Sequence, residues 1–262
     1  MAEKIVITSG KGGVGKTTVT ANLGWMLSGM GFRVALVDID FGLNNLDVVL
    51  GIENNVVYDI LDVLEGRCRI KQALVQCKTR RNLFVLPSNS IESSSPVTGQ
   101  NVKLIVESLN NIFDYIFFDC PAGIDVGFHR AVSCADKALI VTTPSLPSLR
   151  DADKVISILK SYKLDDMGLI LNRARGDLIM NEQMMLPSDV KALLKTDLIG
   201  VLPEEDAVFL SSGRSLPTSS DSYKAYKILA LNVCKGTKKM FDVTSKYSGF
   251  FGSIRRSIKR NV

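Results

Sequence analysis

The stretch that decides the fold is Gly10-Lys11-Gly12-Gly13-Val14-Gly15-Lys16-Thr17, which fits the pattern G-x-x-x-x-G-K-[ST] without a mismatch. It lies between an apolar, strand-like run and a helix-like segment, which is the context that the pattern requires. The glycines let backbone N–H groups curl around phosphate oxygens, because no Cβ obstructs them. The N-terminus of the following helix also favours negative charge. We therefore predict a phosphate-binding loop, in which Lys16 contacts the β- and γ-phosphates and the Thr17 hydroxyl binds Mg²⁺.

Strand-like and helix-like segments alternate along the chain. Short apolar runs are typical of strands that are buried on both faces, and the segments between them have apolar residues at helical spacing. The predicted strands are 4–8, 33–38, 83–86, 115–119, 137–142, 167–171 and 198–201, and the predicted helices are 16–28, 57–64, 102–109, 149–160, 189–194 and 222–240. This order predicts an α/β fold with a doubly wound, mostly parallel β-sheet and helices on both faces, as in P-loop NTPases.

The composition is that of an ordinary globular protein, with 46% hydrophobic and 23% charged residues. Apolar runs all fall short of the roughly 18 residues of a transmembrane helix, and the strand-like start leaves no room for a secretory signal. The five cysteines include no C-x-x-C pair, so we expect reduced thiols in a cytoplasmic protein.

Three aspartates follow strand-like runs. Asp38 ends the second run, Asp40 follows two residues later, and Asp119 ends the run YIFFD. The carboxyl ends of parallel strands meet at the edge where ligands bind. We predict that Asp38 and Asp119 help Thr17 to hold Mg²⁺ and that Asp40 orients the attacking water. A lone aspartate at such a place otherwise caps a helix or forms a turn.

The loop has a second lysine, Lys11, in the sequence KGGVGKTT at residues 11–18. This sequence resembles the deviant Walker A family of ATPases. The resemblance implies that Lys11 reaches the nucleotide of a second subunit and that hydrolysis requires a dimer. The predicted catalytic residues are therefore Lys11, Lys16 and Asp40. The loop residues expected to bind ATP are Gly10, Lys11, Gly12, Gly13, Val14, Gly15, Lys16, Thr17 and Thr18.

Longer stretches resemble the MinD family of septum-site-determining ATPases. They are GLNNLD at 42–47, VVYD at 56–59, DCPAGI at 119–124 and LRDAD at 149–153, and the likeness runs through most of the chain. The family more often has Arg at position 44 and Ser at position 120, where this chain has Asn and Cys.

The resemblance implies an ATP-dependent homodimer with bound Mg²⁺. It implies further nucleotide contacts from Asn45, Asn172 and Arg173, and from the loop Pro203-Glu204-Glu205-Asp206 beside the adenine. It also implies that a helix start with Arg150, Asp151 and Asp153 meets the partners MinC and MinE.

The last residues form a basic tail. Five of the 32 basic residues follow Asp242 and no acidic residue does, so residues 1–242 carry 27 basic and 27 acidic residues. If helical, the tail has an apolar face opposite a basic one, which is typical of a helix that lies on an anionic membrane. The predicted membrane residues are Phe250, Phe251, Ile254, Ile258, Arg255, Arg256 and Lys259, with Tyr247 starting the apolar face. We expect an ATPase domain at 1–245 and a membrane-targeting tail at 246–262.

Together these features favour an ATPase that cycles on and off the inner face of the cell membrane, recruits MinC and is released by MinE. One alternative is a chromosome- or plasmid-partitioning ATPase, but the neutral body argues against nucleic-acid binding. Another is the related flagellar-number regulator, which shares the loop and the tail. A third is an iron–sulfur protein like nitrogenase iron protein, for which Cys120 and Cys134 invite comparison. A role as small, buried core residues is a simpler explanation for those two cysteines.

Overall fold

The computed structural model describes residues 1–41, 45–88, 97–211 and 213–248. These residues form one sheet with the strand order β3-β4-β2-β5-β1-β6-β7-β8. The strands are β1 (Glu3–Thr8), β2 (Val34–Asp38), β3 (Val75–Gln76), β4 (Leu83–Leu86), β5 (Tyr115–Asp119), β6 (Lys137–Thr142), β7 (Met167–Ala174) and β8 (Leu198–Pro203). Neighbouring strands are parallel except for β3, which runs antiparallel to β4 at one edge.

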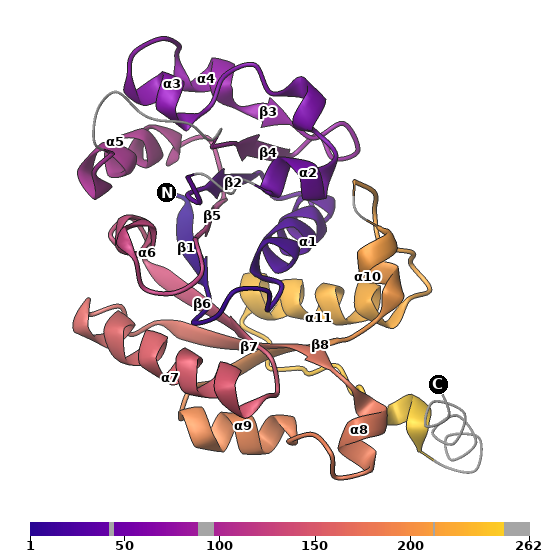
Figure 1. Ribbon diagram of the computed structural model, residues 1–262. Helices are drawn as coiled ribbons and strands as arrows, with labels where there is room; N and C mark the ends of the chain where they lie inside the picture. The colour runs from indigo at the N-terminus through magenta and orange to yellow at the C-terminus, as the bar shows by residue number, and fades with distance from the viewer. Residues whose placement is uncertain (42–44, 89–96, 212, 249–262) are drawn as a thin grey trace.

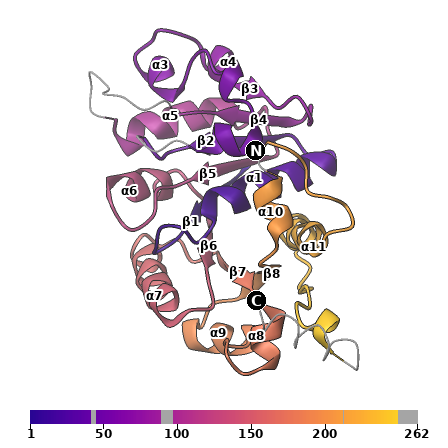
Figure 2. The ribbon, with the colours of Figure 1, turned by 45° about the vertical axis from the view of Figure 1, so that its right-hand side comes forward.

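Helices cover both faces of the sheet (Figures 1 and 2). One face packs against α1 (Lys16–Gly29) and α11 (Asp221–Lys235). The other packs against α5 (Gly99–Leu109), α6 (Val126–Val132), α7 (Leu146–Ser161) and α9 (Pro187–Leu194). The shorter helical segments are α2 (Leu46–Leu50), η1 (Glu53–Asn55), α3 (Ile60–Leu64), α4 (Ile70–Ala73), α8 (Gly176–Met180), α10 (Asp206–Leu210) and η2 (Ser245–Tyr247).

The central strands are apolar on both sides because both sides are covered. In β1, Ile5 and Ile7 pack into the core beneath α1 and α11, whereas Val6 packs into the core beneath α5, α6 and α7. All three are fully buried. Successive side chains of a strand point to opposite faces, so an uninterrupted apolar run fits only a sheet covered on both faces. The predicted doubly wound α/β fold is confirmed.

The seven predicted strands are present, but other elements differ from the sequence prediction. The helices α2, α4, α6, α8 and α10 were not predicted. The two-residue strand β3 was not predicted. The long helix expected at 222–240 ends at Lys235, where Gly236 adopts a left-handed conformation with φ of 62°. The side chain of Asn232 then hydrogen-bonds to residues beyond the helix end. Its Oδ1 accepts from the Thr237 hydroxyl at 2.5 Å and from the Lys239 N–H at 3.2 Å. The helix therefore stops because side-chain bonds replace helical ones.

The segment after α11 packs along the body. Val243 and Tyr247 are buried, and a Cβ on Gly176 would lie 1.9 Å from the Val243 carbonyl oxygen, so only glycine fits there. Lys246 Nζ lies 2.9 Å from Asp221 Oδ2 at the start of α11. The tail was expected to begin at Lys246, yet Lys246 and Tyr247 both contact the body. Its predicted membrane residues, Phe250 to Lys259, lie outside the described residues.

The strand register brings the predicted site together at one edge of the sheet. Asp38 at the end of β2 lies beside Asp119 at the end of β5, and Asp119 lies beside Ile7 of β1, two residues before Ser9. The loop that follows β1 therefore starts next to both carboxylates. Among the described residues, no helix has the length and hydrophobicity needed to cross a membrane.

Candidate functional site

The glycine-rich loop joins β1 to α1 and leaves the helix N-terminus open. Gly13 and Gly15 have φ of 77° and 91°, a backbone conformation that is unfavourable for residues with a Cβ atom. Among the described residues, no side chain caps α1, and its first turn has no acidic residue. Its first N–H groups are therefore available to an anion. The loop has the geometry of a phosphate cradle.

Lys16 is held in the cradle beside a carboxylate. It is only 8% exposed, and its Nζ lies 3.7 Å from Oδ1 of Asp119, which is 2% exposed. A buried ammonium needs negative charge nearby. This distance exceeds that of a hydrogen-bonded ion pair, so Lys16 retains the capacity to bind a phosphate oxygen. The second lysine, Lys11, is exposed on the same loop.

The three predicted acidic residues lie together at the sheet edge. Asp38 is buried, and its Oδ1 accepts a hydrogen bond from the Asp40 N–H at 2.9 Å. Burial, with the negative charge of Asp119 beside it, raises the pKa of Asp38 well above its ordinary value. Burial also raises the pKa of Asp40, and the positive charge of Lys16 opposes that rise. Two buried carboxyl groups side by side favour a site that receives a cation.

Residues at this edge fit a Mg²⁺ ion that is held mainly by phosphate and water. Among the described residues, no group of three His, Cys, Asp or Glu side chains is arranged to enclose a metal ion. Mg²⁺ commonly keeps several waters and binds one or two carboxylates together with substrate phosphates. Thr17 is the first residue after Lys16 on α1, and Asp38 and Asp119 lie at the ends of adjacent strands. These three donors suit such an ion.

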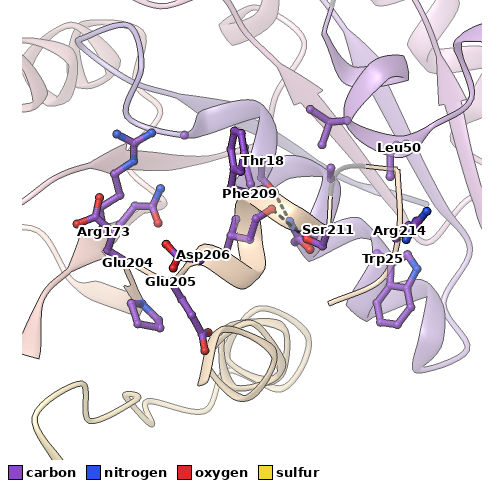
Figure 3. A pocket seen from close by; sticks show the side chains of 17 residues that line it. Thr18, Trp25, Leu50, Arg173, Glu204, Glu205, Asp206, Phe209, Ser211 and Arg214 are labelled. Carbon is purple, nitrogen blue, oxygen red and sulfur yellow. Dashed lines mark hydrogen bonds between the residues drawn. The ribbon is translucent and has the colours of Figure 1, made fainter. Parts of the chain in front are cut away.

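A cavity of about 620 Å³ adjoins the loop (Figure 3). It lies between α1, the end of β7 and the segment that carries α10. The predicted nucleotide residues Gly15, Thr18, Asn172, Arg173 and Pro203 line it, and so do Ala21, Asn22, Trp25, Val49, Leu50, Glu204, Glu205, Asp206, Val208, Phe209, Ser211 and Arg214. Its size suits a base and ribose next to the phosphate cradle. The resemblance implied that the loop at 203–206 lies beside the base, and Glu204, Glu205 and Asp206 do line the cavity. Val208, Phe209, Ser211 and Arg214 were not named as site residues by sequence reasoning.

Asn172 has a role that the sequence did not indicate. Its Nδ2 donates a hydrogen bond of 2.7 Å to the carbonyl oxygen of Val14, and a Cβ on Gly15 would lie 2.4 Å from the same Nδ2. Asn172 is buried. It therefore fixes the backbone of the phosphate loop as well as lining the cavity. Asn45, the other asparagine predicted at the site, is exposed and directly precedes α2.

The predicted partner segment packs against the phosphate loop. Arg150 and Asp153 are exposed on α7, and Asp151 pairs with Lys154 at 3.2 Å. A Cβ on Gly10 would lie 2.3 Å from the carbonyl oxygen of Asp151, so the loop and α7 are in close backbone contact. A protein bound to α7 would thus lie beside the phosphate loop. Positions 42–44, which include the Asn44 departure, lie outside the described residues.

Two of the cysteines, Cys120 and Cys134, lie in the core of the protein. Burial raises the pKa of both thiols. A thiol with a raised pKa is a poor metal ligand and nucleophile. These two residues behave as small apolar core residues.

Known proteins resemble this chain over most of its length. A family model described as an AAA domain matches residues 2–167. The septum site-determining protein MinD of Bacillus subtilis is 43% identical over 237 residues, which are 90% of this chain and 88% of that protein. The chain belongs to the MinD family. MinD proteins are septum site-determining ATPases, which agrees with the resemblance in the sequence.

Solved MinD structures share the fold described above. The MinC:MinD cell division protein complex of Aquifex aeolicus contains a chain that superposes with a TM-score of 0.84 and 42% identity, covering 91% of this chain and 97% of that one. The MinD of Pyrococcus horikoshii, solved with Mg-ADP, superposes with a TM-score of 0.80 and 31% identity, covering 90% and 97%. The first of these proteins is bound to MinC and the second to Mg-ADP.

Proposed function

We propose that this chain is an ATP-driven switch that helps to place the division septum from the inner face of the cell membrane. Residues 1–245 form its ATPase domain and residues 246–262 its membrane-targeting tail. The chain binds ATP with Mg²⁺, forms a homodimer, binds an anionic membrane and recruits MinC. MinE stimulates hydrolysis, and the monomers leave the membrane. The relatives with Mg-ADP and with MinC support the cofactor and the partner.

The observation that carries the proposal is the buried Lys16 beside Asp119 within an open glycine-rich cradle. A buried ammonium, two buried carboxyl groups and an uncapped helix N-terminus converge at one edge of the sheet. An adjoining cavity suits a nucleoside. A triphosphate with a divalent cation complements this set of charges.

The chain's own residues have distinct tasks in hydrolysis. The N–H groups of the loop and Lys16 bind the phosphate oxygens and stabilise the charge that develops there. Asp40 accepts a hydrogen bond from the water that attacks the γ-phosphate in line. Thr17, Asp38 and Asp119 would hold Mg²⁺ directly or through its water shell. When bound, the ion would supply positive charge that stabilises the developing negative charge.

Dimer formation completes the site. Lys11 is exposed at the loop, so it is available to the nucleotide of the second subunit. The isolated chain is therefore expected to hydrolyse ATP slowly. Because α7 contacts Gly10 through Asp151, a partner at Arg150, Asp151 and Asp153 is well placed to change the rate. MinC and MinE are the partners that we propose for this surface.

The tail links the nucleotide state to the membrane. Each basic residue near an anionic surface contributes about 1 kcal/mol, and ordering the tail opposes this contribution. One tail alone therefore binds weakly. When both tails of one dimer bind the same membrane, their combined affinity exceeds that of a single tail about 100-fold or more. ATP thus controls membrane binding by controlling dimer formation.

Sedimentation with vesicles of anionic lipid tests the proposed function. We expect the protein to pellet with the vesicles in ATP and Mg²⁺ and to stay in the supernatant in ADP. A parallel sample with double-stranded DNA tests the partitioning alternative, and we expect no binding to it. Equal pelleting in both nucleotides would contradict the switch, and ATP-dependent binding to DNA alone would favour the partitioning ATPase.

A change at Asp40 separates ATP binding from hydrolysis. We expect Asp40→Ala to bind vesicles in ATP as the unchanged protein does, because Lys16 and the loop remain. Its hydrolysis rate should fall about 100-fold, since a positioned proton acceptor contributes about that factor. Phosphate release measures the rate, and vesicle pelleting measures binding. A wild-type rate would show that Asp40 does not orient the water.

A further inference from the structure

Thr20 makes a contact that its place in the sequence does not explain. It lies one helical turn after Lys16 on α1 and is fully buried. Its hydroxyl lies 3.1 Å from the Lys16 carbonyl oxygen and 3.0 Å from Asp119 Oδ1, a residue 99 positions further along the chain. Both partners are acceptors, so the single hydroxyl proton is shared between the first turn of α1 and the end of β5.

Helical hydroxyls often bond to a carbonyl oxygen of their own helix, and several in this protein do so. Ser28 bonds to the Trp25 carbonyl and Ser108 to the Ile105 carbonyl. Such bonds satisfy a hydroxyl locally. The contact of Thr20 to the Lys16 carbonyl is of this kind, but the contact to Asp119 crosses to the sheet. A purely local role therefore accounts for only one of its two contacts.

The same carboxylate oxygen also faces Lys16. Asp119 Oδ1 lies 3.7 Å from Lys16 Nζ, outside the range of a hydrogen-bonded ion pair. A carboxylate and an ammonium that are both buried attract each other strongly. Without another hydrogen-bond donor, we expect Asp119 to move closer to Lys16 and form a direct ion pair. That ion pair would leave the ammonium unavailable to phosphate and the carboxylate unavailable to Mg²⁺. The Thr20 hydroxyl gives Asp119 a neutral hydrogen-bond donor at a fixed place.

We propose that Thr20 is a positioning residue that holds the Asp119 carboxylate apart from Lys16, leaving Asp119 for the Mg²⁺ site and Lys16 for the phosphates. This proposal rests on the proposed function, because it assigns Thr20 a task in the same nucleotide site. It predicts that the Thr20 hydroxyl affects the dependence of ATP binding on Mg²⁺.

Binding of a fluorescent ATP analogue, titrated with Mg²⁺, tests the proposal in the full chain. Thr20→Val keeps the shape and removes the hydroxyl, and Thr20→Ser restores the hydroxyl. We expect Thr20→Val to raise the Mg²⁺ concentration for half-maximal binding about 10-fold, the effect typical of losing a hydrogen bond to a metal-holding group. Thr20→Ser should stay close to the unchanged protein.

Thr196→Val is the matched control. Thr196 is also buried, but within the described part of the chain its hydroxyl bonds to the nearby Leu194 carbonyl alone, at 3.0 Å. We expect this variant to keep the Mg²⁺ dependence of the unchanged protein. Thermal unfolding of each variant shows whether a change in binding merely follows a change in stability.

The outcomes separate this proposal from the proposed function. An unchanged Mg²⁺ dependence in a folded Thr20→Val would overturn the role of Thr20 and leave the nucleotide site intact. If Thr20→Val and Thr20→Ala are both unfolded while Thr20→Ser folds, the hydroxyl serves the fold and the proposal is wrong. If the unchanged protein shows no Mg²⁺-dependent binding of the analogue, the proposed function itself fails.

Discussion

Lys16→Ala is expected to abolish the ATP-dependent dimer. The change removes a nearly buried ammonium from the phosphate loop. A hydrogen bond between charged groups contributes about 1.5–3 kcal/mol, so the affinity for ATP should fall by a factor of about 10–100. Light scattering after size-exclusion chromatography, in ATP and in ADP, measures the dimer fraction.

The loss should exceed that of one hydrogen bond, because Lys16 also faces the acidic residues. Its Nζ is near Asp119, and Asp119 lies beside Asp38. Without the ammonium, Asp119 and Asp40 lose a nearby positive charge, and binding of a polyanion next to these carboxyl groups becomes less favourable. Vesicle binding in ATP should therefore disappear together with the dimer.

Two further variants test whether the loss of the dimer is specific to Lys16. Lys160→Ala removes an exposed lysine on α7 far from the loop in sequence, and it should leave dimer formation unchanged. Lys11→Ala should still bind ATP, because we propose that Lys11 contacts the nucleotide of the other subunit, yet it should fail to form a dimer. An unchanged dimer fraction for Lys16→Ala in ATP would refute the assignment of the phosphate site.

The second large effect is expected from the tail. The double variant Phe250→Glu and Ile254→Glu should remain in the supernatant with anionic vesicles in ATP. Each large apolar side chain that leaves the membrane costs about 1.5–3 kcal/mol, and each added carboxylate is repelled by anionic lipid. In the proposed dimer two tails bind one membrane, so the losses in the two tails multiply. Binding of ATP and dimer formation should be unchanged.

The matched control places two glutamates on exposed apolar positions of the body. Leu104 on α5 and Leu193 on α9 are 61% and 53% exposed. Leu104→Glu with Leu193→Glu adds the same charge and should leave vesicle binding unchanged. If the tail variant still pellets in ATP, another part of the protein binds the membrane.

Local features of the sequence were sufficient to predict the fold class and the phosphate loop. Apolar runs of four to six residues indicate strands that are buried on both faces, as in β1 and β5. The glycines at 13 and 15 indicate a loop that needs positive φ. Both signals depend only on neighbouring residues. The end of α11 at Lys235 was missed, because Asn232 bonds to residues beyond the helix end and helical spacing does not show this.

The contacts that organise the site depend on the tertiary structure. Asn172 reaches Val14 across 158 positions, and Thr20 reaches Asp119 across 99. Each contact exists because the strand order places β1 between β5 and β6, with β7 next along. The sequence by itself predicted which residues bind a triphosphate. Only the packing of α1 on the sheet decided which side chains orient these binding residues. That packing brings together residues that are far apart in the sequence, and no local sequence pattern links them.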